Sequence, residues 1–379
     1  MKITVIATPS KTDLGDKERF DEMSGTFAGI CYMPDDYATL ESDPIEKTLR
    51  RANMTKANRH HSVFEHEYIT LCLEDIPKIF AMILNNEKIY TTSEKSARYT
   101  KMQPTPLEKE LYFKWINIFK SLIQERYPNE KFIDNRRAEK LAMENARYLL
   151  SIYTPTTMAY TTSYRQLNYL YNWLRTDDEN PILQGLKPYT EDFCAKLEEM
   201  NLIDDDLQKG GSGRKLSLFG ERDRQEYFGD VYSTNYEGSF AQLAQAQRHR
   251  TLSYEMQPLS EDKFFIPKIL NKDPSLVAQW LVDMQKVKDL TPQGKLIKIN
   301  ERGTVENFIL KMNERLCSCA QLEINDQTRL TLSKYIFQTQ DEGIKKMLEP
   351  FARGARCLAG YHCSQPCGFK DGIEMTRDI

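Results

Sequence analysis

The chain lacks the features that would mark a nucleic-acid-binding or membrane-spanning protein. Its formal net charge is -3 at pH 7, whereas affinity for DNA, RNA or anionic lipid comes from dense positive charge. No apolar run approaches the roughly 20 residues that cross a bilayer, and residues 1–7 are too short and too alternating for a signal peptide. We therefore expect no nucleic-acid partner, no membrane partner and a cytoplasmic location.

Cysteine is also sparse, with eight residues in a chain of 379. That number is too small for a disulfide scaffold in a protein of this length, and cytosolic thiols stay reduced. Cys357, Cys363 and Cys367 form a group near the end of the chain, with His362 among them. Their spacing fits no standard zinc finger, so a structural zinc site and a flexible reduced tail both stay open.

The length and composition indicate a folded protein of two lobes. An apolar fraction of 40% and a charged fraction of 28% are typical of globular chains, and 379 residues suffice for two cores. Alternation predicts strands at 2–7 and 67–73. Asp75 and Pro77 are helix-start signals and predict a helix at 76–85. Helical periodicity predicts the remaining helices at 107–127, 138–150, 163–175, 240–247, 276–287, 303–315 and 322–338.

A Gly- and Ser-rich stretch at 209–214 is the most linker-like part of the chain. We therefore expect an N-terminal lobe at 1–205, a linker at 206–224, a C-terminal lobe at 225–349 and a cysteine-containing tail at 350–379.

Three short polar clusters carry the functional signal: residues 60–66, 94–99 and 248–250. Four of the five histidines lie in the first and the third. Guanidinium groups beside an imidazole can clamp a phosphate, although a lone Arg-His-Arg is more often a solvated helix end. His and Glu are also zinc ligands, but residues 60–66 precede a strand without helical ligand spacing, so we expect no metal there.

Taken in order, the clusters resemble the motifs of the flavin-dependent thymidylate synthases (ThyX). Members of that family carry His-x-(Ser/Thr)-x-x-Glu-His, then Arg-His-Arg running almost directly into Asn-Glu-x-Ser-x-Arg-Tyr. Here the first lobe has the histidine motif at 60–66 and the Glu-x-Ser-x-Arg-Tyr motif at 94–99, with Asn-Glu-Lys at 86–88 in place of the triplet. The second lobe has Gln245 and the triplet at 248–250, but it has lost the Glu-x-Ser-x-Arg loop.

The later signatures of the family divide in the same complementary way. Residues 146–150 resemble its Ala-Arg-x-x-Leu-Pro motif, where the second lobe has Lys295. Arg315 and residues 320–324 resemble its Arg and Ala-Gln-x-Glu-Ile motif, which is missing after residue 175 in the first lobe. The resemblance spans about residues 50–180 and 225–340.

This complementary loss has an explanation within the family, whose members are homotetramers with a nucleotide site shared between subunits. If two such subunits are fused in one chain, one intact set of motifs for each half of the site is enough to form one complete site. The resemblance therefore implies an α+β fold of two tandem ThyX-like lobes, each a small, mostly antiparallel sheet with several long helices. The lobes would form a covalent pseudo-dimer with one composite active site, and a homodimer of such chains would restore four lobes.

The resemblance also implies a reaction, the reductive methylation of dUMP to dTMP. FAD would carry the hydride, NADPH would recharge the flavin, and methylenetetrahydrofolate would supply the carbon. Arg315 would be catalytic, by polarising the uracil ring. The nucleotide would be held by Gln245, Arg248, Glu94, Lys95, Ser96, Ala97, Arg98, Arg147 and Arg315. The flavin would contact His60, Ser62, Glu65, Glu94, Arg165, Arg248, His249 and Arg250.

The flavin contacts depart from the family pattern. An Asn-x-Arg and a further Asn are usual, but Ser163 and Tyr169 stand there in the first lobe and Thr304 and Glu306 in the second, while Cys319 replaces a histidine. Three alternatives therefore stay open. They are a paralogue acting on C5 of another pyrimidine nucleotide, a non-catalytic nucleotide or flavin binder, and an unrelated protein that binds single-stranded nucleic acid, against which the net charge of -3 speaks.

Overall fold

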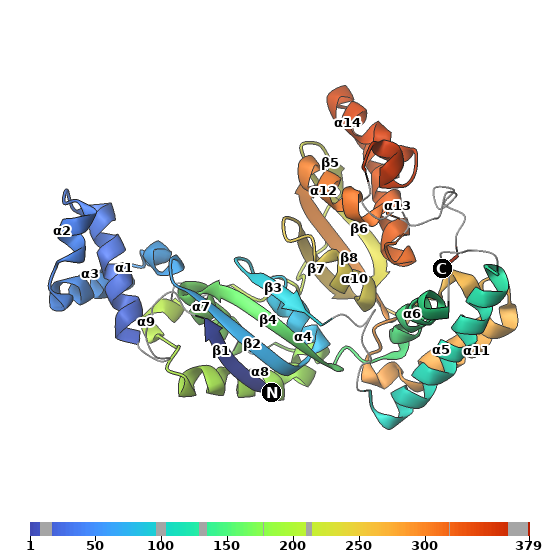
Figure 1. Cartoon of the computed structure of the whole chain (residues 1–379), viewed down its shortest axis with the longest axis horizontal. Helices are drawn as coiled ribbons and strands as arrows, with labels where there is room; N and C mark the ends of the chain where they lie inside the picture. The colour runs from blue at the N-terminus through green and yellow to red at the C-terminus, as the bar shows by residue number, and fades with distance from the viewer. Residues whose placement is uncertain are drawn as a thin grey trace. The chain divides into compact units, whose positions relative to one another are not determined.

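The computed structural model describes residues 1–7, 17–95, 104–128, 135–176, 178–209, 214–317, 319–362 and 378–379. The chain divides into two compact units (Figure 1). Unit 1 comprises Met1–Lys95 and Pro155–Leu216, and unit 2 comprises Ser96–Thr154 and Ser217–Ile379. The chain thus leaves unit 1, contributes a segment to unit 2, and returns.

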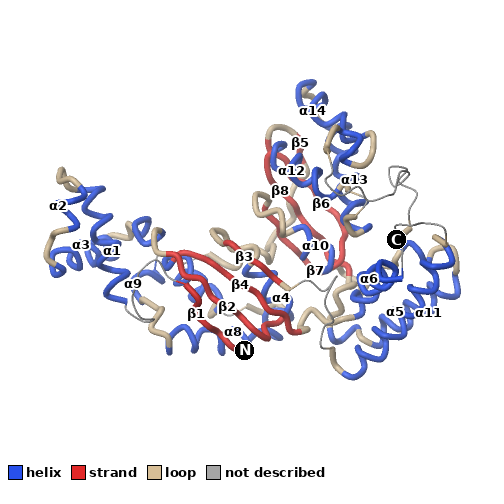
Figure 2. Tube along the Cα trace, viewed as in Figure 1, coloured by secondary structure: helices blue, strands red, loops and turns tan. Residues whose placement is uncertain are grey.

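Unit 1 is built on a four-stranded antiparallel sheet in the order β1-β2-β4-β3 (Figure 2). The strands are β1 (Lys2–Ala7), β2 (Tyr68–Pro77), β3 (Thr91–Glu94) and β4 (Pro155–Ser163). Burial alternates along most of β2 and β4, as it does where one face of a sheet is covered and the other is not. Helices α4, α7 and α8 pack on this sheet.

The helices of unit 1 are α1 (Lys17–Tyr32), α2 (Tyr37–Glu41), α3 (Ile45–Ala57), α4 (Lys78–Leu84), α7 (Tyr164–Leu174), α8 (Pro181–Glu199) and α9 (Asp205–Gln208), with a 3₁₀ turn, η1, at His61–Glu65. Figure 1 shows α1, α2 and α3 gathered together beside the sheet of this unit. Helix α7 begins where β4 ends, because the Ser163 hydroxyl accepts a hydrogen bond from the Gln166 amide and caps the first turn.

Unit 2 repeats the topology with a second four-stranded antiparallel sheet, in the order β5-β6-β8-β7. Its strands are β5 (Tyr227–Phe228), β6 (Val231–Ser239), β7 (Ser253–Pro258) and β8 (Leu296–Thr304). In both sheets the second and fourth strands pair at the centre, and a helix follows each of them directly. The expected α+β class with two small antiparallel sheets is therefore confirmed.

The helices of unit 2 are α5 (Pro106–Arg126), α6 (Asn135–Ala146), α10 (Phe240–Ala246), α11 (Pro274–Lys286), α12 (Val305–Arg315), α13 (Leu322–Gln338) and α14 (Glu342–Ala352). Short 3₁₀ turns are η2 (Arg147–Leu149), η4 (Lys268–Leu270), η5 (Lys288–Leu290) and η6 (Arg356–Ala359). No helix in the described ranges is both long and apolar enough to cross a membrane.

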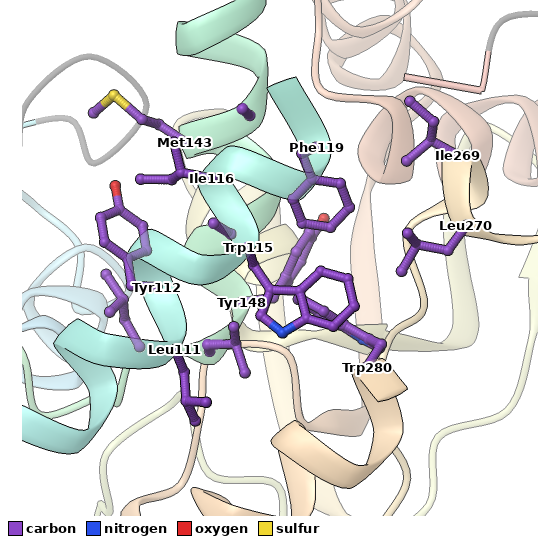
Figure 3. Close-up of a cluster of buried hydrophobic side chains, with 14 of the residues drawn as sticks. Leu111, Tyr112, Trp115, Ile116, Phe119, Met143, Tyr148, Ile269, Leu270 and Trp280 are labelled. Atoms are coloured by element: carbon purple, nitrogen blue, oxygen red, sulfur yellow. The ribbon is translucent and has the colours of Figure 1, made fainter. Parts of the chain in front are cut away.

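The helical core of unit 2 explains why residues 96–154 group with it (Figure 3). The rings of Trp115 on α5 and Trp280 on α11 meet edge to face, with centroids 4.8 Å apart, and Phe119 packs on the same Trp280 ring. Trp115 also donates from Nε1 to the buried carboxylate of Asp283 at 2.9 Å. Both tryptophans are fully buried, so each contributes on the order of 3–5 kcal/mol to the stability of this core. The lobes expected from the sequence, 1–205 and 225–349, are continuous along the chain, whereas the packing groups residues 96–154 with the second lobe. The expected bounds stay a prediction about how a gene duplication divided the chain.

Most predicted helices are present, with corrections at their ends. The helix predicted from Ile76 begins at Lys78, because β2 runs on to Pro77, which takes the N-cap position. The helix predicted to reach residue 150 ends at Ala146 and continues as η2. The helix predicted from 303 begins at Val305, since the residues before it complete β8.

Candidate functional site

The side chain of Gln321 is the centre of a polar cluster in unit 2. Its Oε1 accepts hydrogen bonds from Arg147 Nη2 at 2.5 Å and from Gln245 Nε2, and its Nε2 donates to the Tyr148 hydroxyl. Arg147 lies on η2, Gln245 on the last turn of α10, and Gln321 at the N-cap of α13. All four side chains are buried. The structure therefore brings together two predicted nucleotide-binding residues, Arg147 and Gln245, from distant parts of the sequence.

A buried carboxylate holds this cluster in place. Glu323 accepts hydrogen bonds from the Ser239 amide at 2.9 Å, the Ser239 hydroxyl at 2.7 Å and the Tyr148 hydroxyl at 2.7 Å. Burial raises the pKa of Glu323, and burial together with Glu323 raises the pKa of Tyr148 far above its usual value, so the phenol keeps the proton that it donates. Since Ser239 also caps α10, Glu323 fixes the start of α10 against α13.

Arg315 and His249 form the second part of the site. Arg315 is the last residue of α12, and its Nε donates to Nε2 of His249 at 2.7 Å. Burial and the positive charges of Arg315, Lys311 and Arg248 lower the pKa of His249 to about 2. The imidazole is therefore neutral, and its Nε2 acts as the acceptor.

Lys311, one of the cations that lower the pKa of His249, forms an ion pair with Glu301. Both residues are wholly buried, and Lys311 Nζ lies 2.6 Å from Glu301 Oε2. Glu301 also accepts hydrogen bonds from the hydroxyls of Tyr232 at 2.7 Å and Tyr236 at 3.1 Å. Burial lowers the pKa of Lys311, and Glu301 opposes that effect. The carboxylate has three partners, which a buried charge requires.

The flanking arginines of the triplet are placed differently from His249. Arg248 and Arg250 are exposed, whereas His249 between them is buried with 8% of its surface accessible. The triplet therefore presents guanidinium groups at the surface of unit 2 and an imidazole to its interior.

Unit 1 carries a pocket of about 360 Å³. Its lining residues come from the end of α3, from η1 and from α7, and they are Arg59, His60, His61, Ser62, Arg165 and Tyr169. The predicted flavin residues His60, Ser62 and Arg165 thus share one pocket, and Glu65 pairs with Arg165 at 3.0 Å. Cationic and aromatic side chains in one cavity suit a ligand with both phosphate and ring parts.

The sequence marked Tyr169 as an altered flavin contact, but it did not indicate that His61 lines the same pocket. The Tyr169 hydroxyl hydrogen-bonds His61 Nδ1 at 3.0 Å, and the Arg165 guanidinium lies 5.1 Å from the centre of the Tyr169 ring. His61 Nε2 lies 3.2 Å from the Lys56 carbonyl, and burial lowers the pKa of His61. The available signal was helical spacing, because Arg165 and Tyr169 are four residues apart on α7.

The segment predicted to complete the nucleotide site is described only at its start. Glu94 ends β3 in unit 1 and accepts a hydrogen bond from Lys78 at 2.6 Å, and the Lys95 amide donates to the Thr157 carbonyl at 2.9 Å. Ser96, Ala97 and Arg98 lie outside the described residues, as do Cys363 and Cys367 in the tail.

Unit 1 has an acidic residue where unit 2 has the triplet. Residues 86–88 and 248–250 each follow the helix after the second strand of their sheet. Glu87 is fully buried and pairs with Arg214 at 2.6 Å, and the Arg214 guanidinium lies 4.1 Å from the centre of the Trp173 ring. Unit 1 therefore has a buried carboxylate where unit 2 has the imidazole of His249, and Arg214 neutralises that carboxylate.

The altered positions after the fourth strands have structural roles. Ser163 and Thr304 are the N-caps of α7 and α12, and they accept from the amides of Gln166 and Asn307. In the parts of the chain that the structure describes, no three His, Cys, Asp or Glu side chains are grouped to hold a metal ion.

One family model matches part of the chain. The family model of the thymidylate synthase complementing protein, Thy1, matches residues 16–181. A flavin-dependent thymidylate synthase of Clostridium tetani (strain Massachusetts / E88) is 24% identical over 166 residues, which cover 39% of this chain and 66% of that relative. The chain therefore spans slightly less than two thirds of the length of this curated relative.

Two solved structures are similar at lower identity. The UMP/dUMP methylase PolB from Streptomyces cacaoi, bound with 5-Br dUMP, gives a TM-score of 0.34 and 13% identity, covering 55% of this chain and 93% of that one. Thymidylate Synthase X from Helicobacter pylori, with FAD and dUMP, gives a TM-score of 0.33 and 16% identity, covering 56% and 98%. Residues 16–181 therefore match the Thy1 family of thymidylate synthase complementing proteins, and this match covers less than half of the chain.

Proposed function

We propose that the chain is a flavin-dependent enzyme that methylates C5 of a pyrimidine nucleotide, most simply a thymidylate synthase that converts dUMP to dTMP. One observation carries the proposal: Arg147, from the first half of the sequence, and Gln245, from the second half, share the hydrogen-bonding side chain of Gln321. These two residues match different motifs of the family. Their convergence in unit 2 is what a single composite nucleotide site requires.

The nucleotide side of this site would be formed by unit 2. The exposed Arg248 and the Arg147 guanidinium offer charge-assisted donors for a phosphate. Arg315 would stabilise negative charge that develops on the uracil ring, because its guanidinium is always protonated. His249 accepts a hydrogen bond from Nε of Arg315, and this bond fixes the plane of the Arg315 guanidinium before substrate binds.

The flavin side would use the pocket of unit 1. His60, Ser62 and Arg165 would contact the cofactor in the pocket, with Glu65 orienting Arg165. When bound, the flavin supplies hydride transfer, with NADPH as its reductant and methylenetetrahydrofolate as the carbon donor. The chain's own residues bind the anionic parts of these molecules and position the nucleotide ring. We also propose that the active form is a homodimer of chains.

A second candidate function is nucleotide and flavin binding without turnover. It is favoured by Tyr169, which lines the pocket where the family places an asparagine, and whose hydroxyl is already bonded to His61. Ser163 and Thr304 also favour this second candidate, because both hydroxyls cap helices.

The visible absorbance spectrum of the purified chain with added FAD, before and after dUMP, tests the proposal. A bound-flavin spectrum that shifts with dUMP supports it, and a full assay with NADPH and methylenetetrahydrofolate then separates turnover from binding alone. Substituting UMP or dCMP in that assay identifies the pyrimidine. The absence of bound flavin under these conditions would contradict both candidate functions.

A further inference from the structure

Helix α3 ends in a left-handed turn at a residue that lines the pocket of unit 1. Arg59 has a φ of 59°, a conformation that glycine adopts freely and that a residue with a Cβ adopts at a cost. The Arg59 amide donates to the Lys56 carbonyl at 3.0 Å, and the His60 amide donates to the Thr55 carbonyl at 2.9 Å. These two bonds make a Schellman motif, whose left-handed residue is usually glycine and sometimes asparagine. The turn itself therefore does not favour an arginine.

Helix α8 of the same unit ends in the same motif with the residues that the motif favours. Asn201 has a φ of 53°. Its amide donates to the Glu198 carbonyl at 2.9 Å, and the Leu202 amide donates to the Leu197 carbonyl at 3.0 Å. Both leucines are buried, and an apolar pair at these positions often accompanies the motif. At the end of α3 the residue that corresponds to Leu202 is His60, which lines the pocket beside the left-handed arginine.

The charges around the pocket also point to Arg59. The described residues that line the pocket include no carboxylate. Arg165 lines it too, but its guanidinium pairs with Glu65 at 3.0 Å and lies 5.1 Å from the centre of the Tyr169 ring. Arg59 is exposed, and no carboxylate in the described parts of the chain pairs with it. Since a guanidinium stays protonated at any ordinary pH, Arg59 gives the pocket a positive charge that no described carboxylate neutralises.

We propose that Arg59 is a ligand-binding residue of the unit 1 pocket and that its guanidinium binds a phosphoryl group. Two parallel N–H donors of a guanidinium match two oxygens of a phosphate, which an ammonium group cannot do. The left-handed backbone costs stability, and such a cost is typical of residues that are kept for function. The identity of the ligand rests on the proposed function, under which the phosphoryl group belongs to the diphosphate of FAD.

Urea denaturation tests the backbone cost without any ligand. Arg59→Gly removes the Cβ from the left-handed position, so we expect the folding equilibrium constant to rise about threefold. Arg59→Ala removes the same charge but keeps the Cβ, and the gain should be absent. Asn201→Gly makes the matched change at the end of α8, where the gain should be smaller because asparagine tolerates this conformation. An Arg59→Gly chain no more stable than Arg59→Ala would overturn the claim that function retains a strained arginine.

Titration calorimetry with inorganic pyrophosphate tests the ligand chemistry. Arg59→Ala and Arg59→Gly should each weaken pyrophosphate binding by about tenfold, because both lose the same charge-assisted contact. Arg59→Lys keeps the charge without the planar fork and should recover part of the loss. Undetectable binding of pyrophosphate to the unaltered chain, or affinity that is unchanged in Arg59→Ala, would overturn the proposal.

Two further arginines show whether the pyrophosphate lies in this pocket. Arg165 lines it, so Arg165→Ala should weaken pyrophosphate binding as well. Arg50 is exposed on α3 and does not line the pocket, so Arg50→Ala should leave the affinity unchanged. A loss in Arg50→Ala equal to that in the Arg59 variants would show a general effect of surface charge and would overturn the assignment.

FAD and riboflavin separate this inference from the proposed function. Riboflavin has the ring system of FAD but no phosphate. Arg59→Ala should therefore weaken the binding of FAD and leave that of riboflavin unchanged, and an equal loss for both flavins would overturn the phosphoryl assignment. If the unaltered chain binds pyrophosphate through Arg59 but does not bind FAD, the proposed function fails and the role of Arg59 stands.

Discussion

Arg315 donates a hydrogen bond from Nε to Nε2 of His249 across 2.7 Å, and this contact joins the end of α12 to the turn after α10. The acceptor must be a neutral imidazole, and burial beside three cationic groups ensures that it is. Within the Arg-His-Arg triplet, the histidine therefore positions another residue, whereas Arg248 and Arg250 are exposed at the surface. This division of labour predicts distinct effects of substitution.

Removing the His249 acceptor should weaken dUMP binding. His249→Ala is expected to lower the affinity by about 10- to 100-fold, because a hydrogen bond to a charged group contributes about 1.5–3 kcal/mol. His249→Gln keeps an acceptor oxygen and should recover part of the loss. Titration calorimetry measures both variants, and circular dichroism shows whether they stay folded. Equal losses in the alanine and glutamine variants would contradict the positioning role.

The buried ion pair between Lys311 and Glu301 should be costly to break from one side. Lys311→Met leaves the Glu301 carboxylate buried with only its two tyrosine donors and is expected to cost about 3–5 kcal/mol. The double variant Lys311→Met, Glu301→Gln removes both charges and should regain most of that loss. Urea denaturation provides the free energies. A double variant as unstable as the single one would show that the charges are not what matters.

The buried carboxyl of Glu67 makes stability depend on pH. Burial, opposed by the Ser24 hydrogen bond, raises the pKa of Glu67 to about 7. Since the folded pKa lies above the ordinary value of 4.5, the contribution is fully present below pH 4.5 and is lost as pH rises through 7.

Substituting Glu67 isolates this contribution. Glu67→Gln should raise the free energy of unfolding at pH 8 relative to pH 5, by about 1–3 kcal/mol compared with the unaltered chain. Urea melts of both chains at the two pH values measure the difference. A difference of the opposite sign would show that Glu67 is stabilised in its charged form.

Two arginines on α7 and at its end allow a matched test of the flavin pocket. Arg165 lines the pocket and pairs with Glu65, whereas Arg175 lies outside it and is more than half exposed beside Glu198. Arg165→Ala is expected to weaken FAD binding by about tenfold or more, since it removes a charge-assisted contact. Arg175→Ala should leave FAD affinity unchanged. The quenching of flavin fluorescence provides both affinities, and similar losses in the two variants would argue against a specific pocket.

The sequence predicted the secondary structure better than the packing. Periodicity identified α5 and α13 nearly to the residue, because an apolar stripe is a local signal. It could not show that α5 packs on α11 in unit 2, since a stripe indicates burial and not the partner.

The site was predicted in the same partial way. The family motifs pointed to Arg147, Gln245 and Arg315, and the structure shows the contacts of each. The neutralisation of Glu87 by Arg214 was not foreseeable, because Arg214 follows a Gly- and Ser-rich stretch that has no structural period. Likewise, the sequence Arg-His-Arg at 248–250 does not reveal that His249 is buried while its two neighbours are exposed.

The most direct test of the account is the number of dUMP molecules that one chain binds with FAD present, measured by titration calorimetry. The buried Glu87 in unit 1, where unit 2 has His249, and the cluster around Gln321 in unit 2 predict one site per chain. They also predict that Arg147→Ala and Arg248→Ala each weaken binding at that same site. Two equivalent sites per chain, or a loss confined to one of the two variants, would contradict the composite site.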